Sequence, residues 1–72
     1  MTTQIFAYDA NSNPKYLGFT TDPEVNIVED QTVEMDGKLY RVSKIDFLFK
    51  PAGEPIDVTM RVYLRYLGEV TV

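Results

Sequence analysis

The 72-residue sequence contains neither cysteine nor histidine. The first absence excludes disulfide bonds and thiolate ligands, and the second excludes imidazole ligands of a metal. Together they remove the two side chains most often used as nucleophiles or acid–base groups near neutral pH. We therefore expect a protein that is not an enzyme and that holds no metal or cofactor. The lack of cysteine fits a cytoplasmic location without requiring one.

Long apolar runs and glycine-rich phosphate loops are also absent. No stretch approaches the ~18 apolar residues that a membrane-spanning helix requires. The N-terminus lacks the basic segment that opens a signal peptide. We expect no membrane partner.

The chain is short, but it has the composition of a globular domain. Apolar residues make up 44% of it, and its five tyrosines and four phenylalanines argue against disorder. A core divided in two would be too small at this length, so residues 1–72 are predicted to form a single small β domain. Because one core of this size supplies about 3–5 kcal/mol, another protein chain, a homodimer included, is the expected partner.

Charge is unevenly distributed along the sequence, whose net charge is −4. Residues 1–37 hold seven acids and a single base, whereas residues 38–72 hold six bases and four acids. An acidic total disfavours nonspecific binding to nucleic acid or anionic lipid. A basic face on the second half is still able to attract a phosphate or carboxylate.

β-Branched and aromatic residues separated by turn signals indicate an all-β fold. Residues 4–8 and 15–20 are predicted to form strands on either side of a polar turn at residues 9–14. Residues 23–30 begin with a proline that suits the first turn of a helix, but β-branched residues follow it. We interpret them as a turn and then a short strand or extended loop, with a helix as the alternative.

The dipeptide Asp36-Gly37 separates two β-rich runs. Asp-Gly is the preferred pair for a two-residue type I′ turn, so a hairpin is predicted here. Its register places Val33 opposite Tyr40 on the core face.

A second register follows from the alternation of residues 57–67, whose even-numbered members from Val58 to Tyr66 are predicted to face inward. Pairing Lys50 with Asp57 matches apolar residues inside and opposite charges outside. The expected pairs are Phe47 with Met60, Phe49 with Val58, and Asp46 with Arg61.

The apolar series changes parity between Val42 and Ile45. A β-bulge near Ser43-Lys44 returns both sets to one core and curls the strand. We therefore predict a small antiparallel curled sheet of five to six strands or an SH3-like barrel, in which residues 70–72 pair with the first strand. The arrangement resembles SH3-like barrels in topology alone and carries no family motif. A small open sheet is the alternative.

The first turn has the spacing that begins a calcium loop, at Asp9, Asn11 and Asn13. Pro14 stands where that loop needs glycine, and Thr20 where it needs glutamate. We interpret these residues as caps of a hairpin turn and predict no metal.

The first candidate site is a basic and aromatic strand face. Arg61, Tyr63 and Arg65 form an i, i+2, i+4 row, and Lys44 is the expected cross-strand neighbour of Tyr63. A ring between two guanidinium groups suits stacking on a base or sugar, or anchoring a protein interface. A solvated face balanced by Asp46 is the alternative.

The second candidate site is an aromatic interface on the first hairpin. The buried face of its first strand is ambiguous, because alternating residues on both faces are apolar. Aromatic residues that do not enter the core are typical of peptide or subunit contacts, with ordinary core packing as the alternative. The residues concerned are Phe6, Tyr8, Tyr16 and Phe19.

These features favour a noncatalytic protein-interaction module or small structural subunit. The alternative is a ligand-binding domain for single-stranded nucleic acid or sugar on the Lys44/Arg61/Tyr63/Arg65 face. An enzyme that uses only carboxylates, tyrosine, lysine or arginine is a third hypothesis, for which the sequence shows no constellation.

Overall fold

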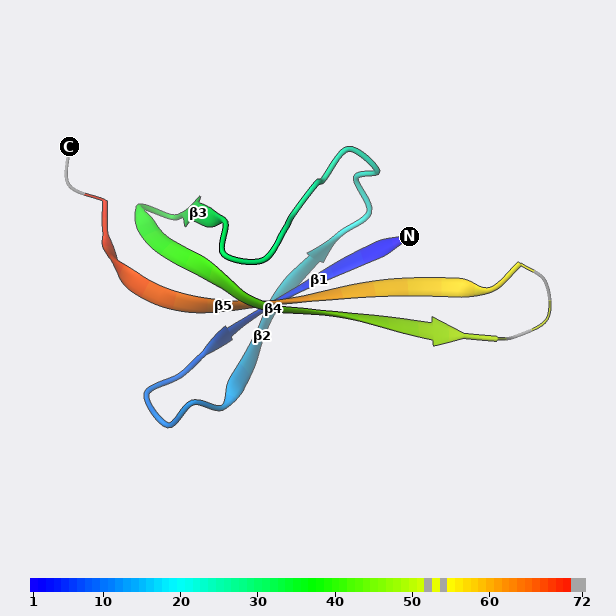
Figure 1. Cartoon of the computed structure of the whole chain (residues 1–72), viewed down its shortest axis with the longest axis horizontal. Helices are drawn as coiled ribbons and strands as arrows, with labels where there is room; N and C mark the ends of the chain where they lie inside the picture. The colour runs from blue at the N-terminus through cyan, green and yellow to red at the C-terminus, as the bar shows by residue number, and fades with distance from the viewer. Residues whose placement is uncertain (52, 54, 71–72) are drawn as a thin grey trace.

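The computed structural model describes residues 1–51, 53 and 55–70 and contains no helix in this part of the chain. Its five strands form one sheet in the order β2-β1-β5-β4-β3, and in Figure 1 all of them except β3 overlap at one crossing point of the view. The strands are β1 (Thr2–Tyr8), β2 (Pro14–Thr20), β3 (Thr32–Met35), β4 (Lys38–Lys50) and β5 (Asp57–Glu69). The all-β prediction is confirmed: the sheet is a curled half-barrel, which is consistent with a small SH3-like barrel.

The sheet is mixed, because β1 and β5 run parallel while every other neighbouring pair is antiparallel. The prediction of a purely antiparallel sheet is therefore wrong at this one pair. β1 does pair with the last strand, but along the middle of β5 and not at its C-terminal end. Phe6, for example, lies beside Tyr63. Parallel strands need a long crossover connection, and the chain between β1 and β5 supplies it.

The expected terminal strand at residues 70–72 is not observed where the structure describes it. β5 continues through Gly68 to Glu69, and Val70 lies outside the strand with its amide donating to the Gly37 carbonyl at 2.9 Å. Thr71 and Val72 lie outside the described residues.

The hairpin at Asp36-Gly37 is confirmed. Both residues have positive φ, 53° and 75°, as a type I′ turn requires. Val33 lies opposite Tyr40, in the predicted register.

The register of β4 against β5 is confirmed as well, and the predicted bulge is present. Lys50 pairs with Asp57 and Phe47 with Met60, and the register shifts between Val42 and Lys44. A second shift between Leu39 and Tyr40 was not predicted. The bulges increase local twist, which allows two long strands to curl around a small core.

The core lies in the middle of the sheet and is small. Its buried apolar side chains, among the described residues, are Val42, Met60, Val62 and Leu64. From the loop of residues 21–31, Ile27 packs against this cluster. Val42 anchors this loop, because its carbonyl accepts from the Asp30 amide and its amide donates to the Gln31 carbonyl, each at 2.9 Å. Residues 23–30 are thus a loop, and the helix alternative is wrong.

Three side chains predicted to face inward are exposed: Phe47, Phe49 and Tyr66, by 54%, 61% and 48%. These side chains lie on the predicted face of the sheet. The prediction was wrong in assuming that this face is covered along its whole length. The contacts of the 21–31 loop with the sheet are at Val42 and, through Ile27, at the buried cluster. Burial therefore falls off toward both ends of the long β4–β5 hairpin.

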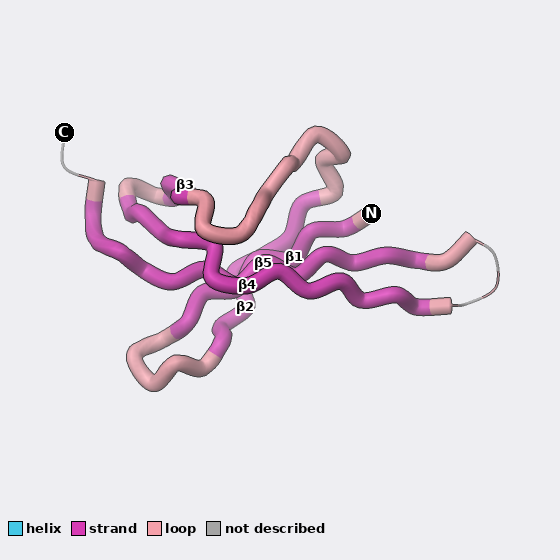
Figure 2. Tube along the Cα trace, viewed as in Figure 1, coloured by secondary structure: helices cyan, strands magenta, loops and turns pink. Residues whose placement is uncertain are grey.

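The protein is more elongated than a compact domain of its length. Its principal extents are 47 × 28 × 19 Å, and its radius of gyration is 13.4 Å, against about 11 Å expected for 72 residues. Figure 2 shows the cause, because the far ends of β4 and β5 project as a ribbon beyond the crossing point.

Candidate interaction surfaces

The first surface is an aromatic cluster on the outer face of the sheet, opposite the core. It consists of Phe6 and Tyr8 from β1, Tyr16 from β2 and Tyr63 from β5. The Tyr63 ring stacks on Phe6 with centroids 5.0 Å apart and on Tyr8 with centroids 6.0 Å apart, while Tyr16 meets Phe6 edge-on at 5.5 Å. These offset-stacked and edge-to-face contacts are the favoured geometries of aromatic pairs.

Two cations complete this cluster. The Lys44 ammonium lies 5.6 Å from the centroid of Tyr63, and the Arg65 guanidinium lies 5.0 Å from that of Tyr8. Lys44 also forms an ion pair with Asp46 at 3.5 Å. Arg61 lies opposite Asp46 across the β4–β5 pair, and its Nε is buried without a hydrogen-bond partner in the described part of the chain.

The two candidate sites inferred from the sequence are therefore mostly one surface. The parallel pairing of β1 with β5 brings Phe6 and Tyr8 beside Tyr63 and Arg65. It also decides the ambiguous face of β1, since Ile5 and Ala7 pack against the core. Phe19 differs: it lies opposite Gln4 and is 64% exposed.

The rings of the aromatic cluster contact mainly one another. Phe6, Tyr8 and Tyr63 are only partly exposed because their rings cover one another, and Tyr16 is the half-exposed member. Stacking a ligand on Tyr63 would require displacing Lys44 or a neighbouring ring. The structure thus joins the predicted residues but leaves little open ring surface.

The turn that follows β1 is capped by Asp9, as predicted. Its Oδ1 accepts from the backbone amides of Asn11 and Asn13, each at 2.9 Å. This is the hydrogen bonding of an Asx turn.

A second surface was missed by the sequence interpretation. We call it the distal ribbon: residues 47–50 of β4 with residues 56–58 at the start of β5. It exposes Phe47, Leu48, Phe49 and Ile56, by 54%, 44%, 61% and 52%. The phenylalanines share the face of the core, because they pair with Met60 and Val58, whereas Leu48 pairs with Thr59 on the other face.

The distal ribbon also carries a free strand edge. β3 pairs only with residues 38–41 of β4. The backbone hydrogen bonds between the 21–31 loop and β4 are made at Val42. Beyond Val42, the sole strand that pairs with β4 in the described part of the chain is β5. Figure 1 shows the end of β4 running beside β5 alone. The backbone groups along the other edge are therefore open to a further strand.

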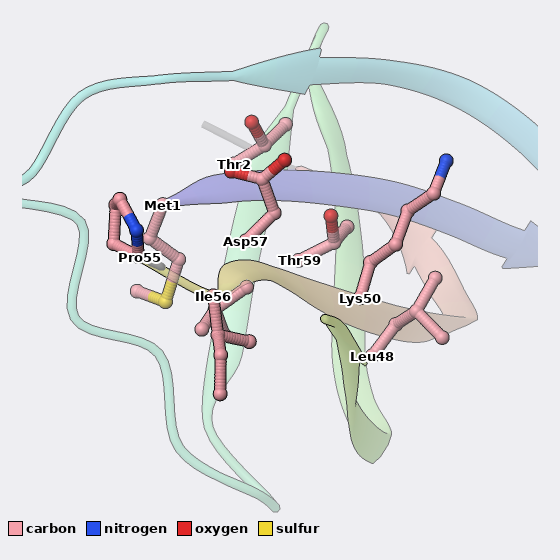
Figure 3. Close-up of a pocket in the computed structure, with 9 residues that line it drawn as sticks. Met1, Thr2, Leu48, Lys50, Pro55, Ile56, Asp57 and Thr59 are labelled. Carbon is pink, nitrogen blue, oxygen red and sulfur yellow. The ribbon is translucent and has the colours of Figure 1, made fainter. Parts of the chain in front are cut away.

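A shallow pocket of about 490 Å³ adjoins the distal ribbon. Figure 3 shows Leu48 and Lys50 on one side of it and Met1 and Pro55 on the other. The described residues contain no group of three or more acidic, histidine or cysteine side chains placed to hold a metal ion. The same residues form no helix that is long and apolar enough to cross a membrane.

Comparisons of the chain with protein-family models, with curated proteins and with solved structures find no significant match. Function is therefore inferred from the two surfaces alone.

Proposed function

We propose that this protein is a noncatalytic interaction module or small structural subunit that contacts another protein chain through the distal ribbon. The observation that carries the proposal is the exposure of Phe47, Leu48 and Phe49 on a strand whose edge is free. An exposed apolar edge of this kind favours association, and known peptide-recognition domains bind partners by adding a strand to such an edge.

Physical considerations point to a partner at this place rather than to an accidental protrusion. A two-stranded ribbon is at best marginally stable in water, and a third strand or a packed face is needed to hold it. Burial of a phenylalanine or leucine side chain contributes about 1.5–3 kcal/mol. The distal ribbon leaves several such side chains in water, while the core has only four buried apolar ones among the described residues.

Affinity capture from the cells that produce the protein tests this function. The bait is the wild-type chain, compared with Phe49→Lys on the distal ribbon and with Tyr16→Lys on the outer face as a matched control. We expect a protein chain, a second copy included, to be retained by the wild type and by the control but lost with Phe49→Lys. Partners that ignore the Phe49 substitution would contradict the proposal.

A second candidate function is the binding of single-stranded nucleic acid or sugar on the outer face. It is favoured by the cations at Lys44 and Arg65, which lie over the rings of Tyr63 and Tyr8. Phosphate binding there is expected to weaken with salt. NMR titration with short oligonucleotides and sugars at low salt decides it, because unshifted resonances around Tyr63 are incompatible with this function.

A further inference from the structure

We propose that the partner of the distal ribbon is a second copy of the same chain, whose β4 edge pairs antiparallel with that of the first about a two-fold axis at Leu48. This inference deepens the proposed function and rests on it. The two half-barrels then share one continuous sheet of ten strands, five from each copy.

The alternation of side chains along the free edge makes it complementary to itself. With the axis at Leu48, Phe47 of each copy lies opposite Phe49 of the other, and Asp46 lies opposite Lys50. Residues directly opposite in an antiparallel pair share a face. Four phenylalanines therefore gather on the core side of the joined sheet. Two leucines and two opposite-charge pairs lie on the outer side.

Neighbouring registers are worse for identifiable reasons. An axis at Phe47 sets Lys44 opposite Lys50, and like charges directly opposite are destabilising. An axis at Phe49 pairs Leu48 with Lys50. A shift of one residue sets one phenylalanine of each copy opposite a charged residue and joins the core face of one copy to the outer face of the other. Only the axis at Leu48 matches apolar residues and charges together.

The molecule as a whole exposes more surface than a compact chain of its length. The accessible surface is 5423 Å², roughly 800 Å² more than the ~4600 Å² typical of a monomer of this length. An isologous contact of this kind also closes at two chains and does not propagate into a fibre.

Disulfide trapping tests the register directly, since the chain has no cysteine of its own. Opposed residues in an antiparallel pair have Cα atoms about 4.5–5.5 Å apart, which a disulfide bridges. Leu48→Cys places two thiols at the axis, so mild oxidation is expected to make the covalent dimer the major species. Leu67→Cys is the matched control, because Leu67 is 47% exposed and Leu48 is 44% exposed. Equal cross-linking of the two variants would overturn the proposal.

Sedimentation equilibrium over a wide concentration range measures the association itself. We expect the wild type to dimerise and Leu48→Asp, which places two carboxylates at the axis, to raise the dissociation constant at least about tenfold. Leu67→Asp is expected to leave it unchanged, and circular dichroism checks that each variant is folded. A wild type that stays monomeric, or a dimer insensitive to Leu48→Asp, would refute the pairing.

These outcomes are separable from those of the proposed function. A monomer that still retains a different chain through Phe49 overturns the second copy as partner but keeps the interaction module. Loss of both self-association and Phe49-dependent capture removes the two together.

Discussion

The middle and the far end of the β4–β5 hairpin differ in burial although they belong to the same two strands and keep one register between Lys44 and Lys50. In the middle, Val62 and Leu64 are shielded by the 21–31 loop and by β1. At the end, Phe47 and Phe49 have the same inward parity and remain in water. Alternation of side chains thus assigns a face, but a second layer decides whether that face is buried.

The largest expected effect tests this contrast with two leucines of the same strand. Leu64→Ala removes a side chain that is 2% exposed and should cost about 2–5 kcal/mol of the free energy of unfolding, comparable with the whole stability of so small a domain. Leu67→Ala, at 47% exposure, should change it by less than about 0.5 kcal/mol. Urea denaturation followed by circular dichroism measures both. Similar losses would mean that the core does not end where the loop does.

A smaller effect is expected at the turn that joins β3 to β4. Gly37→Ala adds a Cβ that meets nothing within 4 Å, but it forces an L-residue to a φ of 75°. The cost is about 1–2 kcal/mol and is purely conformational. Asp36→Gly, in the same turn at a φ of 53°, is the control and should change the unfolding free energy little. An unaffected Gly37→Ala would contradict the type I′ assignment.

The exposed turn between β1 and β2 offers a third test. Asp9→Ala removes the acceptor of two backbone amides and should lower the free energy of unfolding by about 0.5–1.5 kcal/mol. Asp9→Asn keeps a carbonyl oxygen at the same place and should recover most of the loss. Thermal melts of the three proteins measure this. A loss in Asp9→Asn as large as in Asp9→Ala would indicate that the charge matters rather than the hydrogen bonds.

The smallest effect concerns the outer face. A double-mutant cycle with Tyr8→Leu and Arg65→Met isolates the contact between the Arg65 guanidinium and the Tyr8 ring. The guanidinium lies 5.0 Å from the centroid of that ring. The coupling should be about 0.5–1 kcal/mol, the value of an exposed cation–π pair. Additive single substitutions would show that this contact contributes nothing, and that Arg65 is free for a ligand.

Sequence patterns predicted the local pairings well. The Asp36-Gly37 turn, the Lys50/Asp57 register and the bulge near Ser43-Lys44 all depend on residues close together in the chain, where parity, turn chemistry and charge agree. The parallel pairing of β1 with β5 was missed. It joins segments more than fifty residues apart, and both faces of β1 are apolar enough to be buried.

The candidate site shows the same division. Lys44 was correctly expected beside Tyr63, because the hairpin register implies it. The merging of Tyr8 with Arg65 was not foreseen, because it needs the parallel pair. The exposure of the distal ribbon was not predicted for a further reason. An alternating apolar strand has the same sequence pattern whether its apolar face contacts the core or a partner. A core that is too small for so many large side chains was the available signal.

By itself, the sequence determined the all-β fold class, two turns, two registers and one bulge. Each of these follows from neighbouring residues and from the two-residue period of a strand. Only the tertiary structure decided which faces are covered. Coverage depends on where the 21–31 loop lies and on which strand pairs with β1, and both are contacts between distant parts of the chain. The exposed phenylalanines of the distal ribbon follow from that coverage, and with them the surface on which the proposed function depends.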